Sequence, residues 1–172
     1  MIEVYDDLLD DAYSGRISKI LKSTQFPWYF QETTVYGKAD IQSLFHMFAD
    51  ANDPPAVPSP FLIIPTTILD LFSKSSGHEI ESIIRIRANL VLPTSNIDMT
   101  LPHTDYPEKH HVVLYYVDAT DGNTVLLNDD GSIRQEIEPK VGRFVIFDGA
   151  ISHCIRVPTS SRIIFNYNVI LK

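Results

Sequence analysis

The sequence predicts an α+β domain that is mainly β, with helices from its N-terminal part packed against a sheet from its C-terminal part. Apolar residues recur at helical spacing over much of residues 1–78, and they alternate with a period of two over much of residues 79–172. The later part also holds several short strand-like runs separated by turn signals, with no helical pattern between them. At 172 residues the chain suits a single domain. We therefore expect residues 1–172 to form one antiparallel sandwich or barrel, with residues 1–78 as a mostly helical supporting segment.

Three helices are expected in the first part. The first is predicted before Pro27, which disfavours helix at the preceding residue; its apolar positions are Leu8, Leu9, Ala12, Tyr13, Ile17, Ile20 and Leu21. Asp40 is a candidate N-cap for a second, short helix, whose apolar face would carry Ile41, Leu44, Phe45 and Phe48. The proline-rich run D-P-P-A-V-P-S-P predicts an extended loop over residues 53–60, and a third helix is expected within residues 61–75.

The second part is expected to supply five strands, because its apolar runs are β-branched, aromatic or alternating. Turn-forming residues separate these runs, as in D-G-N and D-D-G-S. The predicted strands are residues 80–92, 111–117, 124–127, 143–147 and 161–171.

Amino-acid composition and charge indicate which partners and which cellular compartment to expect. The formal net charge is -8 and no cluster of Lys and Arg is evident, so nucleic acid is not an expected partner. The single cysteine, Cys154, excludes an internal disulfide and favours a reducing compartment. The acidic N-terminus lacks the pattern of a signal peptide, and no apolar run has the length of a membrane span. We expect a cytoplasmic protein; nothing in the sequence indicates an oligomeric state.

Three residues are of the types that bind a metal ion together. His103 and Asp105 are separated by one residue in L-P-H-T-D-Y-P, at positions i and i+2, so in extended backbone their side chains project to the same side. A second imidazole, His153, follows the predicted strand R-F-V-I-F. Two imidazoles and one carboxylate can form the facial triad of non-haem Fe(II) oxygenases, which leaves three metal positions open. The alternative is three unrelated polar residues, because a lone His-x-Asp is common by chance.

A carboxylate-bearing cosubstrate in such a site would need an anchor, for which the planar fork of arginine is well suited. Arg162 opens the last predicted strand; if that strand lies beside the one holding His153, both side chains reach one cavity. Arg156 is a rival anchor, but strand alternation points it away from His153. Asn166 and Asn168 share the parity of Arg162 and are candidate pocket residues.

Four motifs, in the same order, resemble those of the 2-oxoglutarate- and Fe(II)-dependent oxygenase superfamily, nearest to its prolyl 4-hydroxylase-like branch. P-H-T-D is similar to the family's Pro-His-x-Asp, and V-V-L-Y-Y-V-D-A-T-D-G-N-T-V-L to its strand followed by a Gly-x-Thr turn. P-K-V-G-R-F-V-I-F-D resembles its Pro-x-x-Gly-Arg segment, and H-C-I-R-V-P-T-S-S-R-I-I-F-N its distal histidine, Val-Pro turn and basic anchor. The resemblance covers about the last half of the chain.

The resemblance implies a double-stranded β-helix (a jelly roll) over residues 79–172, with helices on the larger sheet. It implies that His103, Asp105 and His153 bind Fe(II), and that Arg162 binds the C5 carboxylate of 2-oxoglutarate. Dioxygen would be the third reactant, and succinate and CO2 would be released. The family often has a tyrosine that contacts the cosubstrate; here Asn89 and Tyr115 are the candidates for that position. Alternation allows only one of Tyr115 and Tyr116 to face the cavity.

By analogy with the family, the expected reaction is hydroxylation of a C–H bond in a peptidyl, prolyl-like substrate or in a small amino-acid-like molecule. The main alternative is a cupin-like module that binds a metal or ligand without catalysis. A metal-dependent hydrolase or isomerase of cupin type is a second alternative. The anchor at Arg162 argues against a pure binding module, which has no use for a carboxylate partner there.

Overall fold

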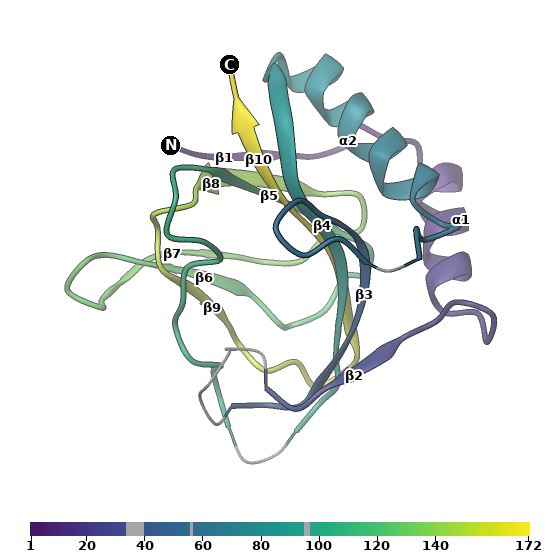
Figure 1. Ribbon diagram of the computed structural model, residues 1–172. Coiled ribbons are helices and arrows are strands. Elements are labelled where there is room, and N and C mark those ends of the chain that lie inside the picture. Colours follow the sequence, from purple (N-terminus) through teal and green to yellow (C-terminus); the bar gives the residue numbers. More distant parts are fainter. Residues whose placement is uncertain (34–39, 56, 95–96) are drawn as a thin grey trace.

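The computed structural model describes residues 1–33, 40–55, 57–94 and 97–172. Within these ranges the protein is mainly β, with ten strands and two helices (Figure 1). The elements follow in the order β1 (Ile2–Tyr5), α1 (Asp11–Leu21), β2 (Tyr29–Gln31), β3 (Ser43–Asp50), α2 (Ile63–Ser76), β4 (Ile80–Val91), β5 (His111–Tyr116), β6 (Thr124–Leu127), β7 (Ile133–Ile137), β8 (Phe144–Asp148), β9 (His153–Ile155) and β10 (Arg162–Leu171).

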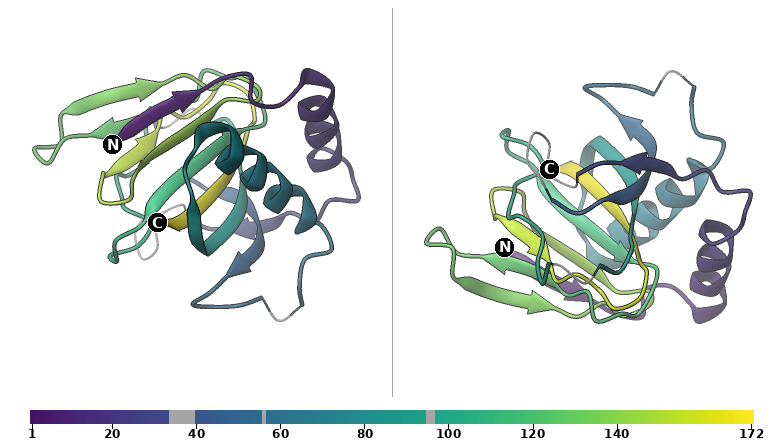
Figure 2. Two further views of the ribbon diagram at one scale, coloured as in Figure 1. Left: turned by 90° about the horizontal axis from the view of Figure 1, so that it is seen from above. Right: turned by 90° about the horizontal axis from the view of Figure 1, so that it is seen from below.

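The strands form two antiparallel sheets. The larger sheet has seven strands in the order β1-β8-β5-β10-β4-β3-β2, and the smaller has three in the order β7-β6-β9. The small sheet lies over one part of the large one, as the two views in Figure 2 show. An apolar cluster between them joins residues of both sheets, including Leu114 and Phe147 from the large sheet and Leu126 and Ile137 from the small one. The protein is therefore a two-sheet structure with a core between its layers.

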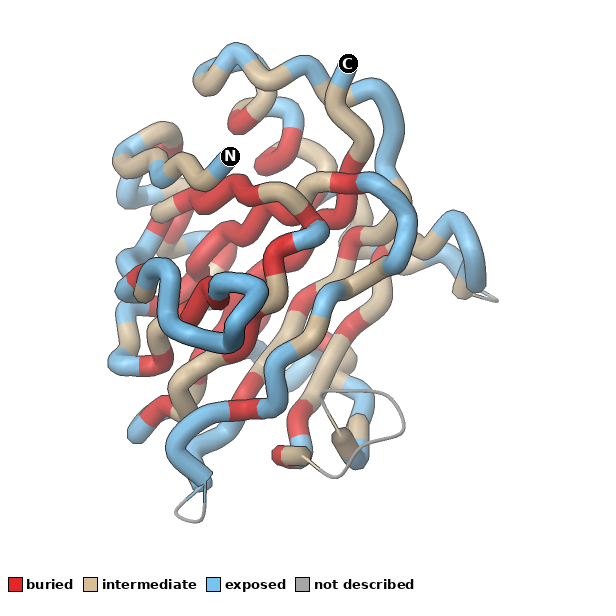
Figure 3. The backbone as a smooth tube through the Cα atoms, turned by 90° about the vertical axis from the view of Figure 1, so that its left-hand side faces the viewer, coloured by how far each residue is buried: buried red, intermediate tan, exposed pale blue. Residues whose placement is uncertain are grey.

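Both helices cover the other face of the large sheet (Figure 1). Ile17 of α1 and Phe72 of α2 belong to one buried cluster together with Val113 and Tyr115 of β5. Alternation along β5 sends Val113 and Tyr115 to the helices, while Val112, Leu114 and Tyr116 face the small sheet. Figure 3 shows the buried residues concentrated in the sheet strands.

The first and third predicted helices are confirmed as α1 and α2. The side chain of Asp10 caps α1 by accepting a hydrogen bond from the Tyr13 amide at 2.6 Å. Gly77 ends α2 with a φ of 79°, a left-handed conformation that glycine adopts without strain. No helix in the described ranges is long and apolar enough to cross a lipid bilayer.

The predicted second helix is wrong, because Ser43–Asp50 forms strand β3 between β2 and β4. Its apolar residues fit helical spacing, but Ser43, Phe45 and Met47 also alternate with Leu44 and His46. Pairing with β4, interrupted by a bulge after Met47, decides between the two patterns.

The five predicted strands are confirmed as β4, β5, β6, β8 and β10. The prediction missed β1, β2, β7 and β9. Residues 1–78, expected to be a mostly helical support, contribute β1, β2 and β3 to the large sheet in addition to the two helices. Strands from both halves of the chain are thus hydrogen-bonded in one sheet.

Candidate functional site

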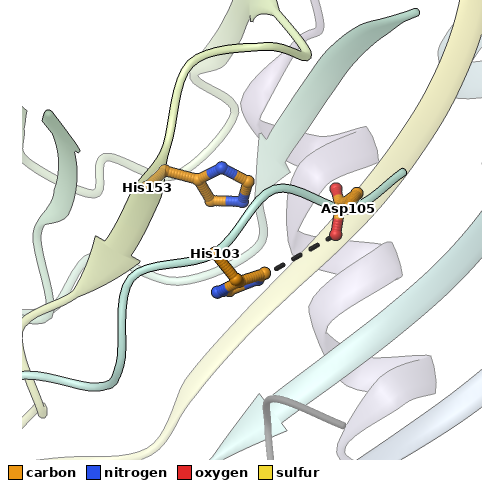
Figure 4. Close-up of side chains that lie close together, drawn as sticks. All are labelled: His103, Asp105 and His153. Atoms are coloured by element: carbon orange, nitrogen blue, oxygen red, sulfur yellow. Dashed lines mark ion pairs between the residues drawn. The ribbon is translucent and has the colours of Figure 1, made fainter. Parts of the chain in front are cut away.

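The structure brings His103, Asp105 and His153 together. One candidate ligand atom from each residue lies within 4.8 Å of the others, and Figure 4 shows the three side chains converging. His103 Nε2 is 4.0 Å from Asp105 Oδ1, and the imidazole ring centres of His103 and His153 are 4.7 Å apart. This spacing suits three ligands around one metal ion.

The main chain fixes the separation of the two histidines. His103 lies in the segment between β4 and β5, and His153 is the first residue of β9. The two residues form an isolated antiparallel bridge, in which each amide donates to the other carbonyl oxygen, at 3.0 and 2.9 Å. Their side chains therefore start from directly paired positions.

Three side chains of the large sheet hold the carboxylate of Asp105. Arg85 of β4 donates to Asp105 Oδ1 at 2.9 Å, and Asn168 and Asn166 of β10 donate to Oδ2 at 2.8 and 3.2 Å. Burial alone would raise the pKa of Asp105, but the Arg85 charge, the nearby histidines and the Asn168 hydrogen bond together hold it well below its usual value. The carboxyl group is therefore anionic, as a carboxylate ligand of a metal would be.

His153 is buried, and burial lowers its pKa to about 4 despite the opposing effect of Asp105. At neutral pH its imidazole is uncharged, which is the form that coordinates metals. The candidate donor set thus contains one carboxylate and at least one neutral imidazole.

Arg162 is a buried guanidinium with no acidic partner. It is 2 % exposed, its Nη2 donates to Thr124 Oγ1 at 2.8 Å, and it lies over the Tyr116 ring at 5.4 Å. Its Nε is buried without a hydrogen-bond partner, and within the described ranges no carboxylate reaches it. Residues 34–39, 56 and 95–96 contain no Asp or Glu. A buried charge in this state is a strong candidate site for an anion.

Arg162 and His153 lie on strands of different sheets. Strand β9 pairs with β6 in the small sheet, whereas β10 lies between β5 and β4 in the large sheet. The condition considered for a shared cavity, that the strands of His153 and Arg162 are neighbours, is therefore not met. Both side chains nevertheless line one cavity of about 950 Å³, because the two sheets face each other across it.

The same cavity contains Asn89 but not Tyr115. Asn89 faces the cavity from β4, next to Ile164 of β10. Tyr115 is buried on the helix side of the sheet, where its hydroxyl donates to Ser14 Oγ at 3.2 Å. The expectation that Tyr115 contacts a cosubstrate is therefore wrong, and Tyr116 is the neighbour that lies under Arg162.

Arg156, the rival anchor, is engaged elsewhere. It forms two hydrogen bonds with the Glu136 carboxylate, at 2.6 and 2.9 Å, and does not line the cavity. Asn166 lines the cavity as expected, and Asn168 binds Asp105 beside it. The sequence prediction gave no role to Arg85, Arg87 or Thr124, although alternation along β4 places both arginines with Asn89 on one face.

The sequence matches no protein-family model and no curated protein. It does share its fold with solved oxygenase structures at low identity. A 2OG-Fe(II) oxygenase family oxidoreductase from Burkholderia pseudomallei is 18% identical with a TM-score of 0.75, over 98% of this chain and 84% of that one. A Pseudomonas putida prolyl-4-hydroxylase is 11% identical with a TM-score of 0.62, over 99% and 92% of the two chains. A Trichoplax adhaerens prolyl hydroxylase, solved with a hypoxia inducible factor peptide, is 14% identical with a TM-score of 0.67, over 98% and 83%.

Proposed function

We propose that this protein is an Fe(II)- and 2-oxoglutarate-dependent dioxygenase built on a double-stranded β-helix. The reaction would hydroxylate a C–H bond of a peptidyl or small amino-acid-like substrate, with release of succinate and CO2. The observation that carries the proposal is the joint placement of a two-histidine, one-carboxylate cluster and the unpaired Arg162 in one cavity. The shared fold with solved oxygenases supports it.

The side chains present fit the proposed metal. His103, Asp105 and His153 would hold Fe(II) as a facial triad and leave three positions for other ligands. When bound, the iron and 2-oxoglutarate would supply the activation of dioxygen that oxidation of an unactivated C–H bond requires. Arg85, Asn166 and Asn168 would orient Asp105, since all three donate to its carboxylate.

Arg162 would bind the distal carboxylate of 2-oxoglutarate. Thr124 and Tyr116 fix its position, and a carboxylate would supply the partner that its buried charge lacks. Asn89, which faces the same cavity from β4, would be a further polar contact for the cosubstrate. The cavity walls would exclude water around these groups.

Anaerobic titration tests the proposal. Adding Fe(II) and 2-oxoglutarate to the protein without dioxygen should give a weak visible charge-transfer band, which His103→Ala should abolish. Arg134→Ala, at an exposed position of β7, should leave the band unchanged. The absence of any band in the wild-type protein, with the fold intact, would refute the proposed cosubstrate site.

Oxygen-dependent succinate release separates the proposed function from its alternatives. A non-catalytic cupin-like module would bind metal without forming succinate. The buried, unpaired Arg162 speaks against a module that binds a metal alone, since there its charge would cost stability without serving a ligand. Turnover of substrate without dioxygen would instead favour a hydrolase or isomerase.

A further inference from the structure

A second guanidinium in the cavity, that of Arg87, is not among the direct contacts of the proposed cosubstrate site, although it holds Asn89 through a hydrogen bond. Four residues of β4 face the cavity: Arg85, Arg87, Asn89 and Val91. Arg85 forms an ion pair with Asp105, and so has an assigned partner. Arg87 stands between this ion pair and Asn89, and its positive charge calls for a separate explanation.

Among the described residues, the hydrogen bonds and the ring contact of Arg87 are with neutral groups. Its Nε donates to Asn89 Oδ1 and its Nη2 to Gln31 Oε1, both at 2.5 Å, and its guanidinium lies 4.9 Å from the centre of the Phe45 ring. In the ranges that the structure describes, no carboxylate comes within ion-pair distance of it. The remaining residues of the chain include no Asp or Glu. Glu32 lines the same cavity but does not pair with Arg87.

Arg87 nevertheless stays charged at neutral pH. Burial, with a smaller contribution from the Arg85 charge, lowers the pKa of Arg87 to about 10. A half-buried cation held by amide oxygens and an aromatic ring is stabilised less than one paired with an anion. An anion entering the cavity would therefore gain a charge-assisted contact at a guanidinium that is already oriented.

The position of Arg87 differs from that of the proposed 2-oxoglutarate anchor. Arg162 lies opposite Val91 in the β4–β10 pairing, and Val91 is four residues beyond Arg87, or about 13 Å along the strand. Arg87 lies opposite Asn166, which donates to Asp105. Arg87 is thus level with the candidate metal centre, and its contacts with Phe45 and Gln31 turn it toward β3 and the edge strand β2.

We propose that Arg87 is a subsite for a carboxylate of the substrate, so that the molecule oxidised carries a carboxylate close to the reacting C–H bond. The inference rests on the proposed function and specifies its substrate class: an acid such as an N-acylamino acid or a peptide with an acidic group, rather than a neutral peptide segment. Gln31 and Phe45 orient the guanidinium, and Arg87 binds the anion.

Matched acid and amide probes test this subsite. The protein is first loaded anaerobically with Mn(II) and 2-oxoglutarate, and the affinity for 2-oxoglutarate is measured by calorimetry. It is then titrated with N-acetyl-L-proline, N-acetyl-L-leucine and N-acetyl-L-lysine and with the primary amide of each. Since a hydrogen bond to a charged group is stronger than one between neutral groups, the acids should bind at least about 10-fold more tightly than the amides.

Variants assign the preference to Arg87. Arg87→Met should reduce the acid-to-amide ratio to about 1 while changing the 2-oxoglutarate Kd less than about 3-fold, and Arg87→Lys should keep part of the ratio because it keeps the charge. Arg134→Met is the matched control, since Arg134 lies on exposed β7. Gln31→Ala is a second variant that leaves the charge in place and should weaken acid binding by loosening its orientation.

Three outcomes would overturn the inference. One is equal binding of acids and amides by the wild-type protein, including no binding of either. Another is an acid-to-amide ratio that survives in Arg87→Met. The third is loss of 2-oxoglutarate affinity in Arg87→Met, which would make Arg87 part of the cosubstrate site, either directly or through Asn89. Failure of the wild-type protein to bind Mn(II) and 2-oxoglutarate in the first step would instead refute the proposed function itself.

Discussion

At the scale of the residue, Gly122 controls the position of Arg162. A Cβ atom at residue 122 would lie 2.8 Å from Cδ of Arg162, 3.0 Å from Cβ of Pro158 and 3.3 Å from the carbonyl oxygen of Arg156. All three distances are shorter than ordinary van der Waals contact, and the first is so short that the stem of Arg162 would have to move. The absence of a side chain at Gly122 thus determines the path by which the guanidinium reaches Thr124.

Gly122→Ala should therefore weaken 2-oxoglutarate binding without removing any group that touches it. We expect the Kd for 2-oxoglutarate to rise about 10-fold, since displacing the guanidinium weakens a charge-assisted hydrogen bond. Metal affinity in the absence of 2-oxoglutarate should be unchanged, and calorimetry measures both. Gly15→Ala is the control, because nothing lies within 4 Å of its added Cβ and helix α1 should gain stability. Equal cosubstrate affinity in Gly122→Ala and the wild type would contradict the prediction.

Part of the candidate site could be read from residue spacing. His103 and Asp105 are two residues apart, and the structure places them with His153 in one cluster. Tyr115 could not be distinguished from Tyr116 in this way, because both are fully buried, on opposite faces of one strand. Alternation shows that two neighbours face opposite sides, but it does not show which side is the cavity.

At the scale of the element, helix α2 depends on a few apolar side chains that pack on the large sheet. Phe72 is fully buried, with ring centres 5.6 Å from Tyr5 of β1 and 5.1 Å from Phe144 of β8. Ile63, at the start of the same helix, is 70 % exposed. The two positions should therefore differ sharply in their contribution to stability.

Phe72→Ala should lower the free energy of unfolding by about 3–5 kcal/mol, because it removes buried apolar area and leaves a cavity against two strands. Ile63→Ala should change it by less than about 0.5 kcal/mol, as is usual for exposed positions. Urea denaturation of both variants measures the difference. A similar loss in both would mean that α2 does not pack on the sheet as described.

Elements with a clear pattern were predictable, and short or ambiguous ones were not. Strand β10 and helix α2 each have enough residues to establish a period. Strands β2 and β9 have three residues each, too few for a pattern, and β3 has apolar residues that fit both periods. For β3, pairing with β4 outweighs local preference, and this contact is invisible in the segment itself.

At the scale of the whole molecule, the candidate metal centre lies where the two sheets meet. His153 belongs to β9 of the small sheet, while Asp105 is held by Arg85, Asn166 and Asn168 of the large sheet. A metal ion bound by both would link the sheets in the folded state. Ligand binding of this kind stabilises the folded state in proportion to its occupancy.

Mn(II) should accordingly raise Tm. At a free concentration about 100 times its Kd, binding contributes about 2.7 kcal/mol, which corresponds to an increase of about 5–10 °C for a chain of this length. His153→Ala should remove most of this increase. Differential scanning calorimetry with and without EDTA measures it, and an equal increase in the variant would place the metal elsewhere.

The two-sheet class was predictable from the number and spacing of strand-like runs, whereas the order of strands was not. Strand β10 follows β9 along the chain but lies between β5 and β4. Such arrangements depend on contacts between distant segments, so the sequence alone could not settle whether the strands of His153 and Arg162 are neighbours.

The paired backbone of His103 and His153 has one further consequence. Neither ring takes part in the two main-chain hydrogen bonds that join these residues, so shortening one side chain leaves the attachment of the other intact. Replacing one of the two histidines with a smaller residue would leave a cavity of the size of an imidazole, while the other histidine keeps its position. A small heterocycle from solution could occupy that place, which makes the centre open to chemical complementation and to redesign with ligands that the genetic code does not provide.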